Sequence, residues 1–326
     1  MVAWLTRRWY QSRPPACWLR PLATLYGALA ARRRAAYARG TRPVWRAPVP
    51  LLVVGNISVG GTGKTPVTEA LCDWLRAEGW RPGIISRGYG GKAEHYPLAV
   101  DATTPAALCG DEPLLLALSS GCPVVVDPDR VRAARHLLDH FDCDLIISDD
   151  GLQHYALGRD IEIAVVDGER GLGNGALLPA GPLREPPQRL ATVDLVVING
   201  GRWDYPGGHR MGLQPGGLRN LAGEPATLAP GSVHAVAGIG NPERFFATLA
   251  AEGFDPRPHP LPDHHPLCES DLEFADPLPV IMTAKDAVKC RAFAPYNRYY
   301  LPVSAQLPAA FFAALKRLLP PPQQKG

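Results

Sequence analysis

The chain has 326 residues, which is long enough for two domains of ordinary size. Its seven cysteines are scattered without a Cys-x-x-Cys pair, which favours a reducing compartment and argues against a structural zinc site. The net charge is only +3, but residues 1–46 contain ten arginines and no carboxylate, so the remainder of the chain has a net charge of −7.

The basic segment, residues 1–46, also contains aromatic residues of the kind found at membrane interfaces. Trp18, Leu22, Leu25 and Leu29 recur at helical spacing, and arginines follow at residues 32–34. This pattern predicts an amphipathic helix whose apolar stripe meets a membrane surface and whose basic end meets anionic headgroups. Two alternatives are that the stripe packs on the folded domain and, with less support, that the segment binds nucleic acid.

We expect this segment to be neither a membrane span nor a signal peptide. No run approaches the roughly 18 apolar residues that a spanning helix needs. Residues 22–31 are apolar and follow a basic stretch, as in a signal peptide. However, an exported protein would meet no ATP for the loop described next, and the stripe continues into arginines where a cleaved segment would end.

A glycine-rich loop follows the apolar run at residues 51–55, and a helical pattern at residues 66–79 follows the loop. This setting predicts a phosphate-binding loop (P-loop), in which backbone N–H groups and a lysine bind phosphates and a hydroxyl reaches Mg²⁺. The predicted ATP-binding residues are Ser58, Val59, Gly60, Gly61, Thr62, Gly63, Lys64 and Thr65. Ser58 stands where the common pattern has glycine, and the alternative is a tight turn without a ligand.

Apolar runs then alternate with helical segments as far as residue 200. The runs lie at residues 83–86, 123–127, 145–148, 161–167 and 195–199, and residues 129–140 form an intervening helix. Such alternation predicts an α/β fold, here a P-loop NTPase-like parallel sheet with helices on both faces over residues 47–200. Because ligands bind at the carboxyl ends of parallel strands, the residues directly after each run are the candidates for function.

Between residues 201 and 230 the chain is rich in glycine and proline and loses its periodicity, so we predict a linker there. A second, smaller α/β domain is predicted over residues 231–326. Its expected strands are residues 233–237, 279–283 and 299–303, and its expected helices are residues 242–252 and 308–319. Residues 238–240 resemble part of a dinucleotide fingerprint but lack its third glycine, and a tight strand-to-helix turn explains them better.

Asp149 and Asp150 follow the run at residues 145–148, downstream of the loop. This is the usual position of the aspartate that holds Mg²⁺ beside a P-loop. Adjacent side chains at the end of a strand point in different directions, so one aspartate can bind the metal directly while the other acts through water or on a partner. The alternative is that both cap a turn or a helix.

Seven motifs in the same order along the chain resemble one known family. They are Ser58 to Pro66, Ser86-Arg87-Gly88-Tyr89-Gly90, Gly110-Asp111-Glu112-Pro113, Asp149 to His154, Gly181 to Glu185, Pro262-Asp263-His264 and Thr283 to Lys289. Together they look like tetraacyldisaccharide 4′-kinase, the lipid A kinase of Gram-negative bacteria. Leu152 departs from the family pattern, where an aromatic residue is common.

The resemblance implies a function and a location. The family phosphorylates the 4′-hydroxyl of tetraacyldisaccharide 1-phosphate with ATP and Mg²⁺ to give lipid IVA, on the path to lipid A and lipopolysaccharide. The implied partners are this acylated glucosamine disaccharide phosphate and the cytoplasmic face of the inner membrane, where the protein would be peripheral. We expect neither a nucleic acid nor an obligate protein partner. A lipid substrate that stays in the bilayer would explain the basic, amphipathic start of the chain.

The resemblance also implies roles for single residues. Asp111 is similar to the family's general base, and His264 to the histidine that pairs with it and raises its basicity. The two lie on opposite sides of the predicted linker, so they would meet across a cleft. Lys64 would neutralise phosphate charge. The implied metal ligands are Thr65, Asp149, Asp150, Gln153 and Glu185.

Further residues are candidates for contacts with the substrate or with phosphate. Arg87, Arg130 and Arg184 each follow the end of a predicted strand, where a guanidinium can clamp phosphate, and Arg184 is the strongest of the three. Glu112 and His154 belong to the same motifs as the base and the metal ligands. Without the resemblance, Asp111 would be interpreted as a turn residue and the segment at residues 263–265 as a loop or a weak metal site.

Two other functions remain open at this stage. One is a nucleotide-dependent switch protein, although Thr283-Ala284-Lys285-Asp286 does not have the spacing of a guanine-binding motif. The other is a P-loop kinase for another small or lipid substrate. Release from membranes after deletion of residues 1–46 would favour the lipid kinase over a kinase for a soluble metabolite.

Overall fold

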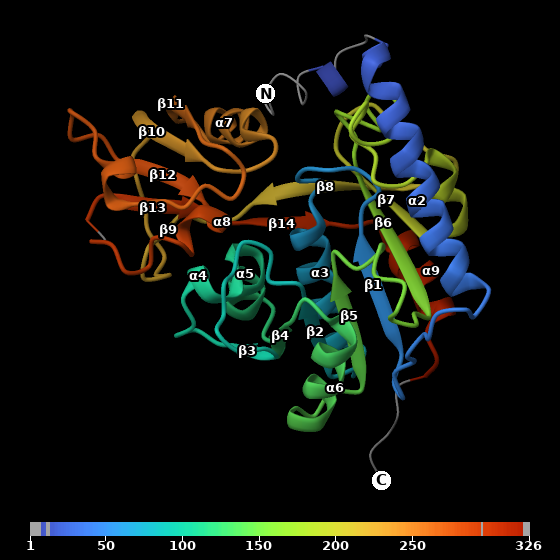
Figure 1. Ribbon diagram of the computed structural model, residues 1–326. Helices are drawn as coiled ribbons and strands as arrows, with labels where there is room; N and C mark the ends of the chain where they lie inside the picture. Colours follow the sequence, from blue (N-terminus) through green and yellow to red (C-terminus); the bar gives the residue numbers. More distant parts are fainter. Residues whose placement is uncertain (1–7, 11–13, 295, 322–326) are drawn as a thin grey trace.

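The computed structural model describes residues 8–10, 14–294 and 296–321 of the chain. Within these ranges the strands form one sheet of nine strands and one of five (Figure 1). Residues 1–7 and 11–13 of the predicted membrane segment lie outside the description. The P-loop NTPase-like α/β fold and the second α/β unit that the sequence predicts are both present.

The large sheet has the strand order β14-β8-β7-β6-β1-β5-β2-β4-β3. Its strands are parallel except for β3 and β14, which run antiparallel to β4 and β8. The bounds are β1 Leu51–Gly55, β2 Pro82–Ser86, β3 Leu98–Val100, β4 Val124–Val126, β5 Leu145–Asp149, β6 Ile161–Asp167, β7 Leu195–Asn199, β8 His209–Pro215 and β14 Val303–Gln306. Since β1 and β5 are neighbours, the P-loop after β1 lies beside the aspartates after β5.

Helices cover both faces of this sheet because its central strands are apolar on both sides. Leu52 and Val54 of β1 pack in one core, which contains residues of α3, α5 and α9, and Leu51 and Val53 pack in the other, which contains residues of α6. The bounds are α3 Lys64–Ala77, α4 Ala106–Cys109, α5 Asp111–Ser119, α6 Arg130–His140 and α9 Ala309–Leu318. Continuous apolar runs are expected of a parallel sheet buried on both faces.

The small sheet has the order β11-β10-β12-β13-β9, in which only β9 is antiparallel to its neighbour. The bounds are β9 Arg219–Asn220, β10 Ser232–Ala237, β11 Asp255–Pro260, β12 Val280–Thr283 and β13 Arg298–Leu301, with helices α7 Pro242–Ala251 and α8 Ala284–Ala287. A 3₁₀ turn at Pro187–Thr192 belongs to the large unit, and another at Glu269–Leu272 belongs to the small unit. Figure 1 shows this unit beside the large sheet, with α8 facing α5.

The boundary between the two units differs from the predicted linker at residues 201–230 and domain at residues 231–326. Strand β8 lies inside the predicted linker and β14 inside the predicted small domain, yet both extend the large sheet, with Leu213 opposite Ala305. Phe311 and Leu315 of α9 are fully buried in the core shared with α3. Only alternate residues of β8 face the core, which is why the apolar signal of this strand is weak in the sequence.

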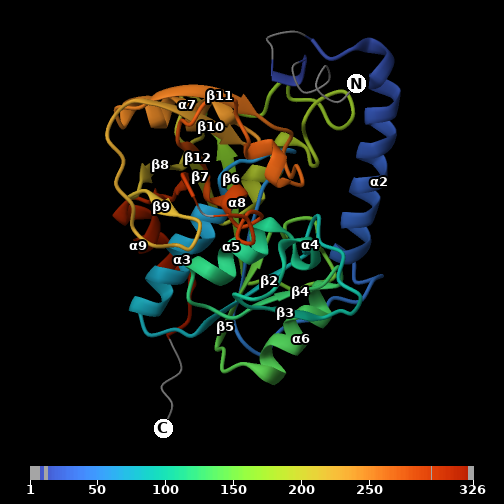
Figure 2. The same ribbon diagram turned by 90° about the vertical axis from the view of Figure 1, so that its left-hand side faces the viewer.

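Helix α2, Arg20–Ala38, runs along one side of the molecule after a 3₁₀ turn at Cys17–Leu19 (Figures 1 and 2). Leu19 of this turn and Ala23 of α2 are buried in a small apolar cluster with Ala180, which attaches the helix to the protein. The predicted apolar stripe faces away from the protein, because the exposed fractions of Trp18, Leu22, Leu25 and Leu29 are 67%, 52%, 57% and 58%. The alternative that the stripe packs on the domain is therefore wrong. Across the described part of the chain, no helix has the length and apolar character that crossing a membrane requires.

Candidate functional site

The P-loop connects β1 to α3 in a conformation that requires glycine. Gly60 and Gly63 have φ of 100° and 94°, a region that other residues rarely adopt. The side chain of Asn199, at the end of β7, donates a hydrogen bond of 3.0 Å to the Thr62 carbonyl oxygen. A Cβ atom on Gly63 would lie 2.3 Å from Asn199 Nδ2. The neighbouring strand therefore fixes the shape of the loop.

Ser58, the departure from the common pattern, has a structural explanation. Its backbone does not adopt positive φ, and it forms a bridge with Leu183 on the segment that also carries Arg184. The next residue, Val59, donates a backbone hydrogen bond of 2.8 Å to the Pro182 carbonyl. This position is tied to a second segment of the site and does not need the conformational freedom of glycine.

Lys64 is the first residue of α3, and its side chain is only 9% exposed. Its Nζ lies 3.6 Å from Asp150 Oδ1. A buried ammonium at the start of a helix, with no closer carboxylate among the described residues, is suited to bind a phosphate anion.

Asp149 ends β5, and one of its carboxylate oxygens is unsatisfied. Oδ1 lies 3.5 Å from Thr68 Oγ1, whereas Oδ2 is buried and accepts no hydrogen bond from the described residues. Burial, together with the charge of Glu112, raises the pKa of Asp149 to about 7. An unpartnered buried carboxylate oxygen beside a P-loop has the chemistry of a Mg²⁺ ligand.

Asp150 has the opposite electrostatic environment, and its side chain is only partly buried, with 31% exposed. Burial alone would raise its pKa, but the charges of Lys64 and Arg184 outweigh burial and lower the pKa well below the ordinary value. Arg184 Nη1 donates to both carboxylate oxygens, at 3.3 and 3.1 Å. Arg130 adds a hydrogen bond of 3.2 Å to the backbone carbonyl of Asp150. The two predicted phosphate clamps thus meet at this aspartate, which stays ionised.

Gln153 and Glu185 lie together behind Asp150. Gln153 Nε2 donates to Glu185 Oε1 at 2.8 Å, and Tyr155 donates to Glu185 Oε2 at 2.6 Å. Both oxygens of this carboxylate therefore already accept hydrogen bonds from protein groups. Across residues 8–10, 14–294 and 296–321 there is no group of three or more histidine, cysteine or acidic side chains arranged to hold a metal. A bound Mg²⁺ would take its remaining ligands from hydroxyl, water or phosphate oxygens.

Asp111 and His264 meet across the cleft between the two units. Asp111 is the first residue of α5, and His264 lies on the loop after β11. His264 Nδ1 is 3.0 and 3.1 Å from the two carboxylate oxygens of Asp111. The sequence predicted that these two residues would meet in this way, although they are 153 positions apart.

The electrostatics of this pair differ from what the resemblance implies. Burial alone would raise the pKa of Asp111, but the hydrogen bond from His264 and the charges of Lys285 and Lys289 lower it below the ordinary value. Burial lowers the pKa of His264, yet its hydrogen bond to Asp111 reverses the effect and raises it above 6.5. His264 therefore keeps Asp111 ionised and does not make it more basic in this arrangement.

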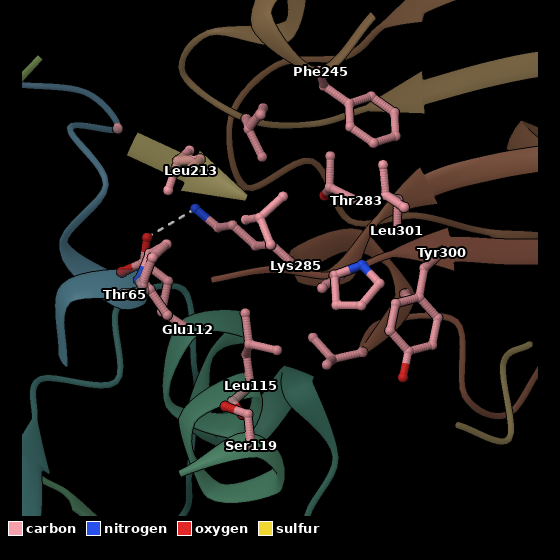
Figure 3. A pocket seen from close by; sticks show the side chains of 18 of the residues that line it. Thr65, Glu112, Leu115, Ser119, Leu213, Phe245, Thr283, Lys285, Tyr300 and Leu301 are labelled. Atoms are coloured by element: carbon pink, nitrogen blue, oxygen red, sulfur yellow. Dashed lines mark hydrogen bonds and ion pairs between the residues drawn. The ribbon is translucent and has the colours of Figure 1, made fainter. Parts of the chain in front are cut away.

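Two lysines that the sequence did not assign complete this cluster. Lys285 Nζ donates to Glu112 Oε1 at 2.9 Å and to Asp263 Oδ1 at 3.0 Å. Lys289 Nζ donates to Asp286 Oδ1 at 2.8 Å and lies 3.8 Å from Asp111 Oδ2. Figure 3 shows Lys285 extending from the small unit toward Glu112 and Thr65. The motif at residues 283–289 was the only signal in the sequence for these contacts.

A cavity of about 710 Å³ opens beside the P-loop between the two units. Residues 61–66 line one side, and Ile239, Phe245 and Tyr300 are among the residues that line the other (Figure 3). Gly240 approaches the loop closely, since a Cβ atom there would lie 2.5 Å from the backbone nitrogen of Gly61. The volume is in the range of small-molecule and cofactor sites.

The remaining candidates surround this centre without touching Asp111. Arg87 follows β2 and is exposed. Burial and the charge of Arg130 lower the pKa of His154 to about 4, so its ring is neutral at physiological pH. His154 Nε2 is buried and has no hydrogen-bond partner among the described residues.

Replacing Asp149 with asparagine should stabilise the protein in the absence of metal and remove its response to Mg²⁺. The neutral amide avoids the unfavourable burial of an unpartnered carboxylate, so the free energy of unfolding should increase. We expect the melting temperature Tm to rise by about 2–4 °C for each kcal/mol of added stability. The measurement is a thermal scan with and without MgCl₂ in the presence of ATP. A variant whose Tm still responds to Mg²⁺ as in the wild type would contradict the metal assignment. Asp204→Asn, at a side chain that is 75% exposed, is the control.

Comparisons with known proteins converge on one family. The family model described as tetraacyldisaccharide-1-P 4′-kinase matches residues 15–320. A tetraacyldisaccharide 4′-kinase of Azotobacter vinelandii is 51% identical over 324 residues and covers 97% of each chain. Another, of Alkalilimnicola ehrlichii, is 54% identical over 306 residues and covers 90% of each. The crystal structure of LpxK from Aquifex aeolicus in complex with ATP matches with a TM-score of 0.76 at 28% identity, over 92% of this chain and 98% of that one.

Proposed function

Because this chain belongs to the tetraacyldisaccharide 4′-kinase family, and so phosphorylates a lipid A precursor with ATP, we propose that the transfer occurs between Lys64 and Asp111 in the cleft. The observation that carries this proposal is the Asp111–His264 contact, which joins the two units opposite the P-loop. Phosphoryl transfer needs charge neutralisation, alignment and a group that accepts the proton of the attacking hydroxyl. The cleft offers residues for each need.

Charge neutralisation is assigned to the P-loop and its lysine. The backbone N–H groups of residues 58–65 and the ammonium of Lys64 would bind the phosphates of ATP. Arg130 and Arg184 already hold Asp150 in place, so they support the site through that carboxylate. His154 and the exposed Arg87 are proposed to contact the lipid substrate.

Thr65 and Asp149 would hold Mg²⁺ directly, and Asp150 would act through water. Gln153 and Glu185 would instead order Arg184, which contacts Asp150. This division follows from the free oxygen of Asp149 and from the occupied oxygens of Glu185. When bound, Mg²⁺ supplies positive charge that neutralises phosphate oxygens in the transition state.

Asp111 is proposed to accept the proton of the 4′-hydroxyl as its oxygen attacks the γ-phosphorus of ATP. A bond forms between that oxygen and phosphorus, the bond to the β–γ bridging oxygen breaks, and ADP leaves. Asp111 is ionised before the step, as a base must be. The hydrogen bond from His264 orients its carboxylate and lets the pair share the proton after the attack.

Helix α2 is proposed to bring this site to the cytoplasmic face of the inner membrane. Its leucine stripe is exposed, and a surface depression at its end is lined by Leu29 and Arg32, Arg33, Arg39 and Arg42, among others. Apolar side chains followed by a cluster of arginines favour an interface with anionic lipids. On its other side, α2 contacts the site, because Tyr26 donates to the Arg184 carbonyl at 3.1 Å.

Replacing Leu22, Leu25 and Leu29 together with glutamate should abolish binding to vesicles of anionic phospholipid. Each buried leucine contributes about 1.5–3 kcal/mol, so the triple change should weaken binding by more than about 100-fold. Sedimentation with vesicles measures this, and turnover of substrate dispersed in detergent should be retained. Thr24, Ala28 and Ala31 are exposed on another side of α2, and their triple change to glutamate adds the same charge as a control. Equal loss of binding in both variants would contradict the stripe as the membrane contact.

The test of the function itself is an assay with purified protein, Mg-ATP and tetraacyldisaccharide 1-phosphate, followed by mass measurement of the lipid. The expected product carries one additional phosphate. Absence of that product under conditions in which the Azotobacter vinelandii enzyme forms it would contradict the proposed function.

A further inference from the structure

Lys285 occupies an unusual position relative to the proposed catalytic pair. It lies in the first turn of α8, directly after β12, where Thr283 caps the helix by accepting a hydrogen bond from the Asp286 backbone N–H. Its side chain is 14% exposed and enters the cleft from the small unit (Figure 3). Burial alone would lower its pKa, but the charges of Glu112, Asp111 and Asp263 raise it, so the ammonium stays charged.

The two acidic partners of Lys285 are the sequence neighbours of the pair. Glu112 follows Asp111 on α5 of the large unit, and Asp263 precedes His264 on the loop of the small unit. One ammonium, at 2.9 and 3.0 Å from these carboxylates, therefore connects the two backbones that carry the pair. Its Nζ also lies 3.5 Å from His264 Nε2, on the side of the ring away from Asp111.

His264 needs such support because of its backbone. Its φ is 62°, in the left-handed region that is unfavourable for a residue with a Cβ. A strained residue keeps its conformation only where its surroundings fix it. The contact between Lys285 and Asp263 fixes the residue directly before it, and the Asp111 contact fixes its ring.

We propose that Lys285 is a positioning residue that holds Asp111 and His264 together across the cleft and sets the pH at which the pair becomes active. This inference rests on the proposed function, since it assigns a role within the same reaction. Lys285 acts through Glu112, Asp263 and His264 and need not touch the substrate.

The charged groups around the pair fix the sign of its pH dependence. His264 Nδ1 and Asp111 contact each other, Lys289 lies on the other side of Asp111, and Asp263 and Lys285 lie beside His264 Nε2. The ring of Tyr89 lies against His264 with centroids 4.9 Å apart. Lys285 lowers the pKa of both members of the pair. Removing its charge raises both, so the pH below which activity is lost should move upward.

The test compares Lys285→Met with the wild type in the full-length protein, using Mg-ATP and tetraacyldisaccharide 1-phosphate. We expect kcat to fall by about 10–100-fold, as for a misplaced reacting group, while KM for ATP changes by less than about threefold. The acid limb of the kcat/KM profile should move upward by about one pH unit. A structural role alone would lower the amount of active protein without moving this limb.

Two further variants and one control make the outcome decisive. Lys285→Arg retains the charge, so its acid limb should stay at the wild-type pH even if kcat falls. Asp263→Asn removes one of the two carboxylates that bind Lys285, so it should lower kcat without loss of ATP binding. This variant tests the inference if Lys285→Met does not fold. The control is Lys316→Met, which removes an exposed lysine of α9 that pairs with Glu78 just after α3, and it should match the wild type.

An unmoved acid limb in Lys285→Met, or an equal shift in Lys285→Arg, would overturn the inference. So would wild-type kcat in both Lys285→Met and Asp263→Asn. These results differ from failure of the proposed function, in which the wild-type protein itself would form no phosphorylated lipid.

Discussion

Replacing Lys64 with alanine should lower kcat by about 10³-fold or more, the largest effect expected of any single substitution in the P-loop. The lysine is buried at the start of α3, where its ammonium faces the site and its closest described carboxylate is 3.6 Å away. Its removal leaves the charge that develops on the transferring phosphoryl group without its main protein cation. Initial rates at saturating ATP and lipid measure the effect.

The control for this substitution is Lys316→Ala, which removes an exposed lysine from α9 and should leave the rate unchanged. Thermal scans of both variants establish that they are folded. If Lys64→Ala kept a rate within threefold of the wild type, the loop at residues 58–65 would not be the phosphate site of this enzyme.

Replacing Asp111 with asparagine should lower kcat by about 10²–10⁴-fold, the range for loss of a general base, with little change in KM for ATP. Asparagine retains the shape of the side chain and an acceptor for His264 but cannot take a proton. In the wild type, kcat/KM should fall as pH drops through the pKa of His264, which the contact with Asp111 raises above 6.5. Protonation of His264 makes Asp111 a weaker base, so activity is lost on the acid side of the pH profile.

His264→Asn is the matched change on the other side of the cleft. It should lower kcat less than Asp111→Asn and should remove the acid limb at that pH, because the titrating ring is gone. Wild-type turnover in Asp111→Asn would require another proton acceptor. An unchanged acid limb in His264→Asn would show that a different group titrates there.

Much of the large unit follows from local patterns in the sequence. Its central strands are apolar runs because they are buried on both faces, and the P-loop is recognisable because Gly60, Gly63 and Lys64 have tasks that few other residues can perform. The order of the strands does not follow from such patterns. Strands β8 and β14 were missed because only alternate residues are buried or partly buried, and the return of α9 to the large core depends on long-range packing.

Some residues of the site could be predicted from the sequence, whereas most of their contacts could not. Asp111, Asp149, Asp150 and His264 were named from motifs, and the structure brings Asp111 and His264 into contact. The occupied oxygens of Glu185 and the bridge made by Lys285 depend on neighbours that are distant in the sequence. Charges acting through space also reversed one expectation, since Asp111 is held ionised and is not made more basic.

The family match also decides between the functions that the sequence left open. It covers residues 15–320, and the relatives of similar length carry the name of one lipid kinase. A nucleotide switch or a kinase of small soluble metabolites has no comparable support. The exposed leucines of α2 agree with a substrate that remains in a membrane.

The central claim is that the acceptor hydroxyl lies between Asp111 and the γ-phosphate held by Lys64. A crystal structure with a non-hydrolysable ATP analogue, Mg²⁺ and tetraacyldisaccharide 1-phosphate tests it most directly, through the distance from the 4′-oxygen to the Asp111 carboxylate. The expected distance is about 2.6–3.2 Å, with the γ-phosphate in contact with Lys64 Nζ. A 4′-hydroxyl bound elsewhere, with a different side chain within hydrogen-bond reach of it, would contradict the claim.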